Sequence, residues 1–216
     1  MQVTFRYLTY NGNGYKPYMA EDMTTKNIGY FTDFLVFPAV LLALVFAPRS
    51  DSRQAFHLAE ALAILAGIVT WSFLEYAIHR FILHNDLWFA QDHDQHHAAP
   101  KAFIATPTWL TLLILVFAVY LPSIYCLGLD LGSAFGFGVT SGYLFYSFVH
   151  FILHHWDARP GGLFYKWKRT HALHHYAGKD RNFGVTSSFW DYVFSTLASP
   201  KDDRAVLGHR EERLGG

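Results

Sequence analysis

The chain of 216 residues has only one cysteine, Cys126. A single cysteine cannot form a disulfide within the chain, and it excludes metal sites built from several thiolates, such as four-cysteine zinc sites and iron–sulfur clusters. Nitrogen and oxygen atoms must therefore hold any metal ion that this protein binds.

Charge is also scarce, and it is balanced. Charged residues make up 16% of the sequence, and 17 basic and 17 acidic residues give a formal net charge of zero with neutral histidine. Binding to a phosphate backbone requires a basic excess, so we expect no nucleic-acid partner. The sequence is 52% hydrophobic and 18% aromatic. This composition is richer in apolar residues than that of a typical soluble protein and indicates a membrane protein.

Four apolar segments are candidates for membrane spans, since a hydrocarbon core of about 30 Å needs about 20 helical residues. They cover residues 28–47, 57–83, 109–129 and 131–149. The second segment contains Glu60, Glu75 and Arg80, which must lie near its ends or face protein because a charge inside a bilayer costs several kcal/mol. The last two segments are separated by Asp130 between two glycines, which predicts a helical hairpin.

Four spans would place both termini and all the histidine-rich segments on the same side of the membrane. Only Arg49 and Arg53 among the basic residues would fall on the other side, so the positive-inside rule makes the histidine side cytoplasmic. We see no signal-peptide pattern in the first 27 residues and no ER-retrieval signal in the final RLGG. We therefore expect a bacterial cytoplasmic membrane in preference to the ER.

Eleven of the 13 histidines lie in four short clusters, with the sequences HRFILH (79–84), HDQHH (93–97), HFILHH (150–155) and HALHH (171–175). Residues three and four apart share a helix face, so the two HxxHH trios and the pair His150 and His154 suit metal coordination. We expect each trio to supply part of one coordination shell. His79 and His84 are five apart, about 140° around a regular helix, and we expect them to bind different metals.

Ten ligands are too many for one ion, so we expect two metal ions with about five histidines each. His155 points away from His154 and is expected to be structural, while His57 and His209 are expected to be interfacial or solvated. Nitrogen ligands suit zinc, copper, iron or nickel, and the sequence has no HExxH zinc-peptidase motif. Attack on the C–H bonds of lipid tails favours two irons that activate O2, with zinc able to replace iron in purified samples.

The clusters and their surroundings resemble the membrane fatty acid hydroxylase superfamily, also called the sterol desaturase family, and most closely the catalytic domain of fatty acid 2-hydroxylases. The resemblance is carried by EYAIHRFILH (75–84), HDQHHAAPKAF (93–103), SGYLFYSFVHFILHH (141–155) and KRTHALHHYAGKDRNFGVTSSFWDYVFST (168–196). By motif position it implies the metal ligands His79, His84, His93, His96, His97, His150, His154, His171, His174 and His175. The closing motif, with Phe183, Trp190 and Asp191, is expected to pack beneath the metals.

This resemblance implies an all-α integral membrane fold, in which four transmembrane helices are capped by a cytosolic helical lobe around a dimetal centre. One domain, 1–216, would comprise a polar N-terminal segment (1–27), a membrane region with a cytosolic histidine-bearing link (28–155) and a cytosolic C-terminal part (156–216). The implied activity is O2-dependent hydroxylation of a lipid, with a fatty acyl chain as the expected substrate. No cytochrome b5 domain is fused to this sequence, so we expect a separate electron-transfer protein.

Two alternatives differ in substrate or in class. Sterol or carotenoid oxidation and desaturation would use the same type of metal centre with a substrate bound in a different position. A membrane metal-binding or transport protein would spread ionisable ligands along its spans, whereas the histidines here gather at one face. Five aromatic residues of the second and fourth spans are candidates for a hydrophobic channel to the metals: Trp71, Phe73, Tyr143, Phe145 and Tyr146.

Overall fold

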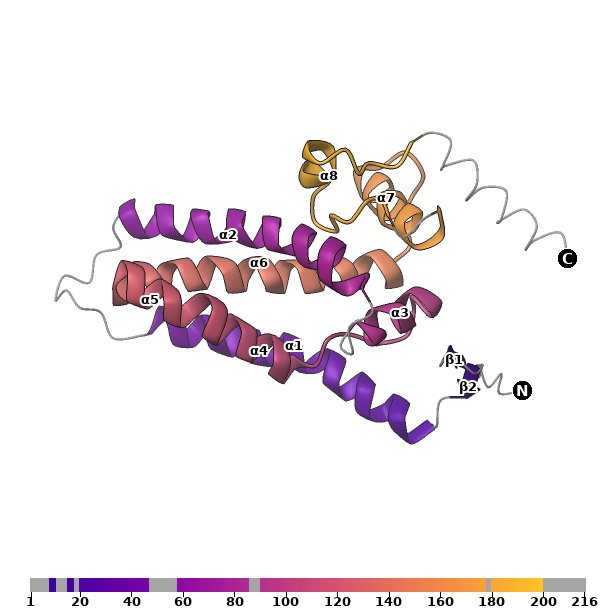
Figure 1. Cartoon of the computed structure of the whole chain (residues 1–216), viewed down its shortest axis with the longest axis horizontal. Coiled ribbons are helices and arrows are strands. Elements are labelled where there is room, and N and C mark those ends of the chain that lie inside the picture. Colours follow the sequence, from indigo (N-terminus) through magenta and orange to yellow (C-terminus); the bar gives the residue numbers. More distant parts are fainter. Residues whose placement is uncertain are drawn as a thin grey trace, which may run out of the picture.

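The computed structural model shows a bundle of long helices with a smaller lobe at one end (Figure 1). It describes residues 8–10, 15–17, 20–46, 58–85, 90–177 and 180–199, with side chains from residue 29 onward. Apart from one antiparallel pair of short strands, β1 (Leu8–Tyr10) and β2 (Tyr15–Pro17), the described secondary structure is helical. This architecture agrees with the all-helical class expected from the sequence.

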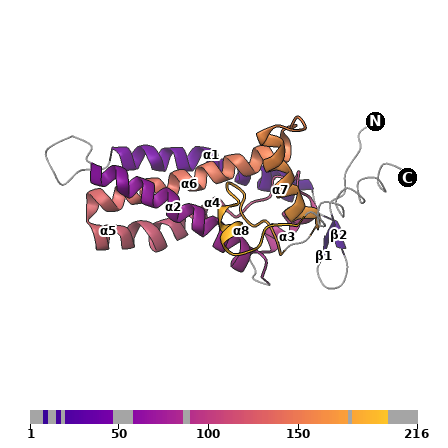
Figure 2. The ribbon, with the colours of Figure 1, turned by 90° about the horizontal axis from the view of Figure 1, so that it is seen from above.

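The bundle consists of four helical rods that run side by side (Figure 2). In chain order they are α1 (Ala20–Val45), α2 (Leu58–Ile78) continued by the π-helical turn η1 (His79–Leu83), the rod α4–η2–α5 (Thr108–Ile114, Leu115–Tyr120 and Leu121–Leu127), and α6 (Leu129–His155). The lobe contains α3 (Gln91–Ala98), α7 (Leu163–Ala177) and α8 (Phe189–Val193). Four rods thus correspond to the four apolar segments of the sequence.

Three of these rods are long and apolar enough to cross a membrane: Leu58–Leu83, Thr108–Leu127 and Leu129–His155. The described apolar part of α1, Gly29–Val45, is shorter than this. The two acidic residues of α2, Glu60 and Glu75, are both 4% exposed. They therefore face protein, as the cost of a charge in lipid requires.

Close approach of α2 and α6 sets the spacing of the bundle. Gly67 of α2 and Gly138 of α6 lie in direct contact, and a Cβ atom on Gly138 would overlap the backbone oxygen of Ile64. Small residues allow membrane helices to pack closely. The predicted hairpin between α5 and α6 is confirmed, and Gly128 forms its turn with a φ of 80°.

Two clusters of buried residues stabilise the fold, one within the bundle and one between the bundle and the lobe. Phe37, Trp71, Leu115, Val139 and Tyr143 form the centre of the bundle. A second cluster consists of Val149 and Leu153 of α6 together with Val185, which belongs to the loop before α8. This second cluster fixes the lobe on the end of α6, where the histidines lie.

Candidate metal centre

The ten predicted ligands come together in two groups of five at the lobe end of the bundle. The first group is His79, His84, His93, His97 and His174; the second group is His96, His150, His154, His171 and His175. Within each group the possible ligand atoms lie within 4.8 Å of one another. The division into five and five is the one expected from the sequence.

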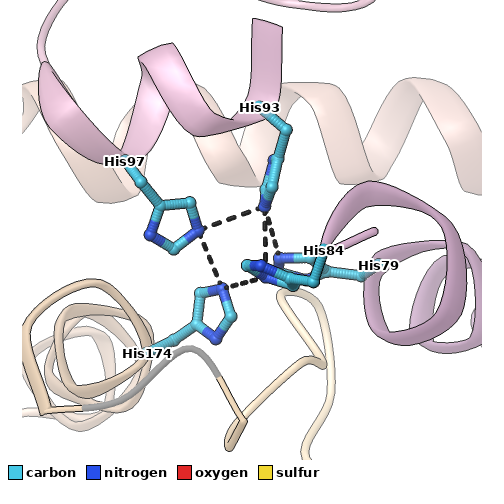
Figure 3. Close-up of side chains that lie close together, drawn as sticks. All are labelled: His79, His84, His93, His97 and His174. Atoms are coloured by element: carbon cyan, nitrogen blue, oxygen red, sulfur yellow. Dashed lines mark hydrogen bonds between the residues drawn. The ribbon is translucent and has the colours of Figure 1, made fainter. Parts of the chain in front are cut away.

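The ring Nε2 atoms of the first group converge on one point (Figure 3). His93 Nε2 lies 3.1 Å from Nε2 of His79 and of His97 and 3.3 Å from that of His84. His174 Nε2 lies 3.1 Å from Nε2 of His84 and of His97. Two nitrogens bound to one ion at about 2.1 Å are about 3 Å apart when they are neighbours in its coordination shell. The observed spacing therefore fits a shared metal ion.

The second group has the same character. His154 Nε2 lies 2.8 Å from that of His171 and 3.2 Å from that of His150, and the Nε2 atoms of His171 and His175 are 3.1 Å apart. His96 faces this set, with its ring centroid 4.6 Å from that of His150. Both ring nitrogens of His96 are buried, and within the described residues neither has a hydrogen-bond partner. A buried polar atom without a partner is costly, and a cation would satisfy it.

Backbone carbonyls select the tautomer of two ligands in the first group. His79 Nδ1 donates to the carbonyl oxygen of Phe183 at 2.5 Å, and His174 Nδ1 donates to that of Arg181 at 2.7 Å. A carbonyl oxygen can only accept, so Nδ1 carries the proton in both rings and the lone pair lies on Nε2. The lone pairs therefore point into the cluster. Such outer contacts are characteristic of metal-binding histidines.

The expectation that His79 and His84 bind different metals is wrong, because both residues belong to the first group. Their helix is not regular at this point: residues 79–83 form a π-helical turn. In a π-helix the hydrogen bond joins residues five apart, so a spacing of five brings two side chains to the same face. Such turns occur frequently at functional sites.

Each HxxHH trio is divided between the two groups, whereas the sequence predicted that a trio would serve one shell. His93 and His97 enter the first group and His96 the second; His171 and His175 enter the second group and His174 the first. At 100° per residue, positions i and i+4 differ by about 40°, while i+3 lies about 60° to the other side. The i, i+4 pair therefore stays together and the third ring crosses to the neighbouring group.

Burial keeps the histidines of the lobe neutral. The pKa values of His93, His96, His171 and His175 all lie below the usual histidine value, mainly because of desolvation and also because neighbouring imidazoles repel a second positive charge. Neutral imidazole is the form that binds metal. These four rings are therefore ready to coordinate an ion at neutral pH.

Two carboxylates hold the loop whose carbonyls orient the first group. Asp191 is fully buried and accepts hydrogen bonds from the backbone nitrogens of Phe183 and Gly184, both at 2.8 Å, and from Thr196 Oγ1 at 2.7 Å. Glu75 of α2 accepts from the backbone nitrogens of Val185 at 2.7 Å and Thr186 at 2.8 Å. The loop is thus tied to both α8 and α2.

The closing motif therefore does more than pack. The ring centroid of Phe183 lies 5.8 Å from that of His79 and 5.6 Å from that of His174, so this residue packs against the first histidine group. The role of Asp191 as a hydrogen-bond acceptor was not anticipated. Its signal in the sequence is the only charge in the apolar stretch FWDYVF.

An apolar cavity of about 330 Å³ reaches both histidine groups from within the bundle. His79 and His93 of the first group and His96 and His150 of the second group line one end of it. Its other walls include Tyr30, Asp33 and Phe34 of α1, Trp71 of α2, Leu110 and Ile114 of α4, and Tyr143 and Tyr146 of α6. The cavity has the size and lining of a site for an apolar ligand.

Three of the five aromatic candidates from the sequence, Trp71, Tyr143 and Tyr146, line this cavity. The other two, Phe73 and Phe145, are 40% and 53% exposed on the outside of the bundle. The contribution of α1 to the cavity was missed. Its signal was Asp33, the single charge in the first apolar segment, which accepts hydrogen bonds from Thr108 and Tyr143.

A second, polar pocket of about 730 Å³ borders the first group at His84. It is lined by Arg80, Phe81, His84, Asn85, Asp94, Asp180 and Phe183. His84 therefore borders a polar space, while His79 and His93 border the apolar cavity.

Among the described histidines, His155 belongs to neither group. His155 stacks on Phe103 and Phe151, with ring centroids 4.9 and 4.7 Å away, which agrees with the structural role expected for it. His57 and His209 lie outside the described residues.

Comparison with known proteins gives a consistent result. The model of the fatty acid hydroxylase family matches residues 64–196, a range that contains all ten predicted ligands. Over 191 residues the chain is 35% identical to a fatty acid 2-hydroxylase of Macaca fascicularis, covering 81% of this chain and 46% of the relative. It is 36% identical over 148 residues to the ceramide very long chain fatty acid hydroxylase SCS7 of Saccharomyces cerevisiae, covering 62% of this chain and 37% of that protein. The chain thus spans less than half the length of these two relatives.

A solved structure is also similar. It is described as full-length scs7p with only the hydroxylase domain visible, and it aligns with a TM-score of 0.63 and 27% sequence identity. The alignment covers 80% of this chain and 67% of that chain.

Proposed function

Since the chain belongs to the fatty acid hydroxylase family, we propose that it is a membrane-bound dimetal oxygenase that uses O2 and external electrons to hydroxylate a lipid on its fatty acyl chain. The observation that carries this proposal is the meeting of two five-histidine groups with one apolar cavity. An apolar cavity accepts a lipid tail, and the histidines at its end mark where the reaction occurs.

Two metal ions would be held by the ten histidines, one by each group. We propose iron for both sites in the active enzyme, since nitrogen ligands accept iron and the family's reaction is an oxidation. When bound, the two ions would supply the activation of O2 that attack on an unactivated C–H bond requires. Zinc competes for the same ligands and ranks above ferrous iron in affinity.

The protein's own residues bind and orient the substrate. The apolar walls formed by Trp71, Leu110 and Ile114 exclude water and align the acyl chain. The carbonyls of Arg181 and Phe183 hold the Nδ1 protons of two ligands and keep their Nε2 lone pairs directed inward. Apolar walls alone let a long chain slide along the cavity. The position of the histidines at the end of the cavity therefore determines which carbon is oxidised.

The proposed topology has four spans with the histidines at the cytoplasmic end. Basic residues of the described lobe, including Lys166, Lys168 and Arg169, support this orientation through the positive-inside rule. A bacterial cytoplasmic membrane remains our proposal for its location. The electrons would come from a separate redox protein on the cytoplasmic side.

The number of metal ions bound per chain tests the site directly, because a ligand can be removed from each histidine group separately. Wild-type protein purified from iron-supplemented cells should contain about two metal ions per chain, and both His174→Ala and His175→Ala should retain about one and lose activity. His155→Ala is the matched control and should retain two ions and full activity. Two ions and full activity in either His174→Ala or His175→Ala would refute the ligand assignment.

Mass spectrometry of lipids tests the reaction. Membranes from cells that express the wild-type chain should contain a lipid heavier by one oxygen atom, and cells with His174→Ala should lack it. Consumption of O2 should accompany the product. A loss of two hydrogens in place of a gain of oxygen would mean desaturation, and an oxygenated sterol would shift the assignment to sterol oxidation. Bound metal with no oxidised lipid would favour a metal-binding protein.

A further inference from the structure

The lobe that carries α7 and α8 has two very different surfaces. The segment 186–197, which contains α8, has the sequence TSSFWDYVFSTL, and its only charged residue, Asp191, is fully buried. Its outer face carries exposed apolar side chains: Phe189 at 58%, Tyr192 at 74%, Val193 at 48% and Phe194 at 44%. On α7, in contrast, the charged side chains of Lys166 and Arg169 are exposed together with the apolar Leu163 and Tyr176. The outer face of α8 therefore lacks charge, whereas that of α7 is mixed.

The apolar face of α8 is continuous with the outside of α2. Trp190 packs on Phe73 with ring centroids 5.0 Å apart, and its Nε1 atom donates to Ser72 Oγ at 3.1 Å. Phe73 is the last member of an i, i+4 row on α2 that also contains Leu65 and Val69, which are 56% and 53% exposed. In a membrane span an exposed apolar row faces lipid. The same lipid must then meet α8.

The depth of this contact can be worked out from helix geometry. The span Leu58–Leu83 has 26 residues, or about 39 Å at about 1.5 Å per residue. A hydrocarbon core of about 30 Å takes about 20 residues, so even a core that starts at Leu58 extends to about residue 77. Phe73 then lies about 6 Å inside the core, and Trp190 beside it lies at a similar depth. Interfacial segments bury their apolar faces by about 5–10 Å.

From this juxtaposition we propose that the outer face of α8, formed by Phe189, Tyr192, Val193 and Phe194, is a membrane-binding surface inserted into the lipid of the histidine-side leaflet. The C-terminal lobe is then divided, with α8 in the bilayer and the basic helix α7 in water. Figure 1 shows α8 beside the last turns of α2 and α7 farther along the axis of the bundle. Aromatic residues are enriched at this level of a membrane. The proposal goes beyond the proposed activity and rests only on the membrane-spanning role of α2.

Insertion of α8 has a consequence for the site. Asp191 projects inward from α8 and holds the loop that orients His79 and His174. A segment anchored in lipid would therefore support the first histidine group from below. The lobe would need the membrane for full order, not only for access to its substrate.

Fluorescence quenching tests this proposal, and the single native cysteine makes it practical. In a Cys126→Ser background, an environment-sensitive fluorophore is attached to the new cysteine of Tyr192→Cys. The variant Phe189→Cys, labelled in the same way, gives an independent second measurement. Lys166→Cys on α7 is the aqueous control, and Leu65→Cys on α2 is the lipid control. The proteins are reconstituted in phosphatidylcholine vesicles, and only variants with the metal content and elution volume of the parent are compared.

Labels at 189 and 192 should behave like the label at 65: blue-shifted emission, strong quenching by doxyl-labelled lipid and little quenching by iodide. The label at 166 should be quenched by iodide and not by doxyl lipid. If both α8 labels follow the label at 166 while that at 65 is quenched by lipid, the proposal is overturned and the spanning role of α2 stands. If the label at 65 is itself quenched only by iodide, the membrane assignment of α2 fails and the proposal fails with it.

Discussion

Replacement of Asp191 by asparagine should loosen one metal site and leave the other intact. The side chain keeps its size, but its amide nitrogen can donate and cannot accept a hydrogen bond. Asp191 accepts from two backbone nitrogens and one hydroxyl. At least one of these buried donors must lose its partner in the variant, and the other two must bond to a neutral acceptor in place of a charged one.

The magnitude follows from these three bonds. One buried donor without a partner costs about 1–3 kcal/mol, and two bonds that lose their charge assistance cost about 1 kcal/mol each. Burial raises the pKa of Asp191, which means that desolvation opposes its charge, so the neutral side chain regains part of this loss. A net loss of about 2–3 kcal/mol remains. At about 2–4 °C per kcal/mol, the melting temperature should fall by about 4–12 °C.

The effect on the metals should be uneven. Phe183 and Gly184 are the residues whose backbone nitrogens bond to Asp191, so their hydrogen bonds are weakened or lost in the variant, and the carbonyl of Phe183 is the one that orients His79. Loss of an outer-shell contact typically lowers metal affinity by about 10- to 100-fold. In Asp191→Asn one of two ions should therefore become removable by a chelator that leaves both ions in the wild type, while the second group keeps its ion.

The assay is elemental analysis after timed exposure to the chelator, together with a thermal melt in detergent. Asp157→Asn makes the same chemical change at an exposed position and should leave both measurements unchanged. Equal chelator resistance and equal melting temperatures for Asp191→Asn and Asp157→Asn would refute the argument that this carboxylate positions the first group. Equal loss of both ions would show general unfolding in place of local loosening.

Three further changes test the fold and the electrostatics. Gly138→Leu should separate α2 from α6 and lower the free energy of unfolding by about 1–3 kcal/mol, seen as a lower melting temperature. Gly29→Leu, where an added Cβ meets nothing within 4 Å, should leave the melting temperature unchanged. Asp33→Leu should weaken the attachment of α1 to α4 and α6, because Thr108 and Tyr143 lose their common acceptor. The free energy of unfolding, measured by chemical denaturation of wild type and variant reconstituted in the same way, should fall by about 1–3 kcal/mol. Metal-free protein should lose stability as the pH falls below about 6.5, since the histidines protonate only when unfolded; each buried histidine of the lobe contributes up to about 1.4 kcal/mol per pH unit, and melting curves between neutral and mildly acidic pH measure it.

Spacing in the sequence was sufficient to identify the histidines but not to distribute them. The i, i+4 and i, i+3 relations locate His93, His96 and His97 on one side of α3. His96 lies about 60° to one side of His93 and His97 about 40° to the other side, and this difference assigns His96 to a separate group only once α6 and α7 are in place around α3. Tertiary arrangement, not local periodicity, decides which ring meets which ion.

The prediction that His79 and His84 bind different metals was wrong for a different reason. A regular helix was assumed for residues 79–84, and there the two rings diverge. The π-helical turn of η1 brings them together, and the carbonyl of Phe183, more than a hundred residues away in the chain, accepts from one of them. A local irregularity stabilised by such a distant contact leaves no pattern in the sequence.

The two pockets give the first histidine group an apolar side and a polar side. His79 and His93 of the first group line the apolar cavity, together with His96 and His150 of the second, so a lipid tail in the cavity can approach both groups. His84 of the first group faces the polar pocket with Arg80 and Asp94. Under the proposed function, water-soluble partners and protons would approach the first group through this polar pocket, and the lipid would fill the apolar cavity. The second group touches the apolar cavity and has no residue in the lining of the polar pocket. We therefore expect only the first group to respond to substitutions at Arg80 or Asp94. Asp94→Asn should change the electron-transfer rate and leave the KM for the lipid unchanged.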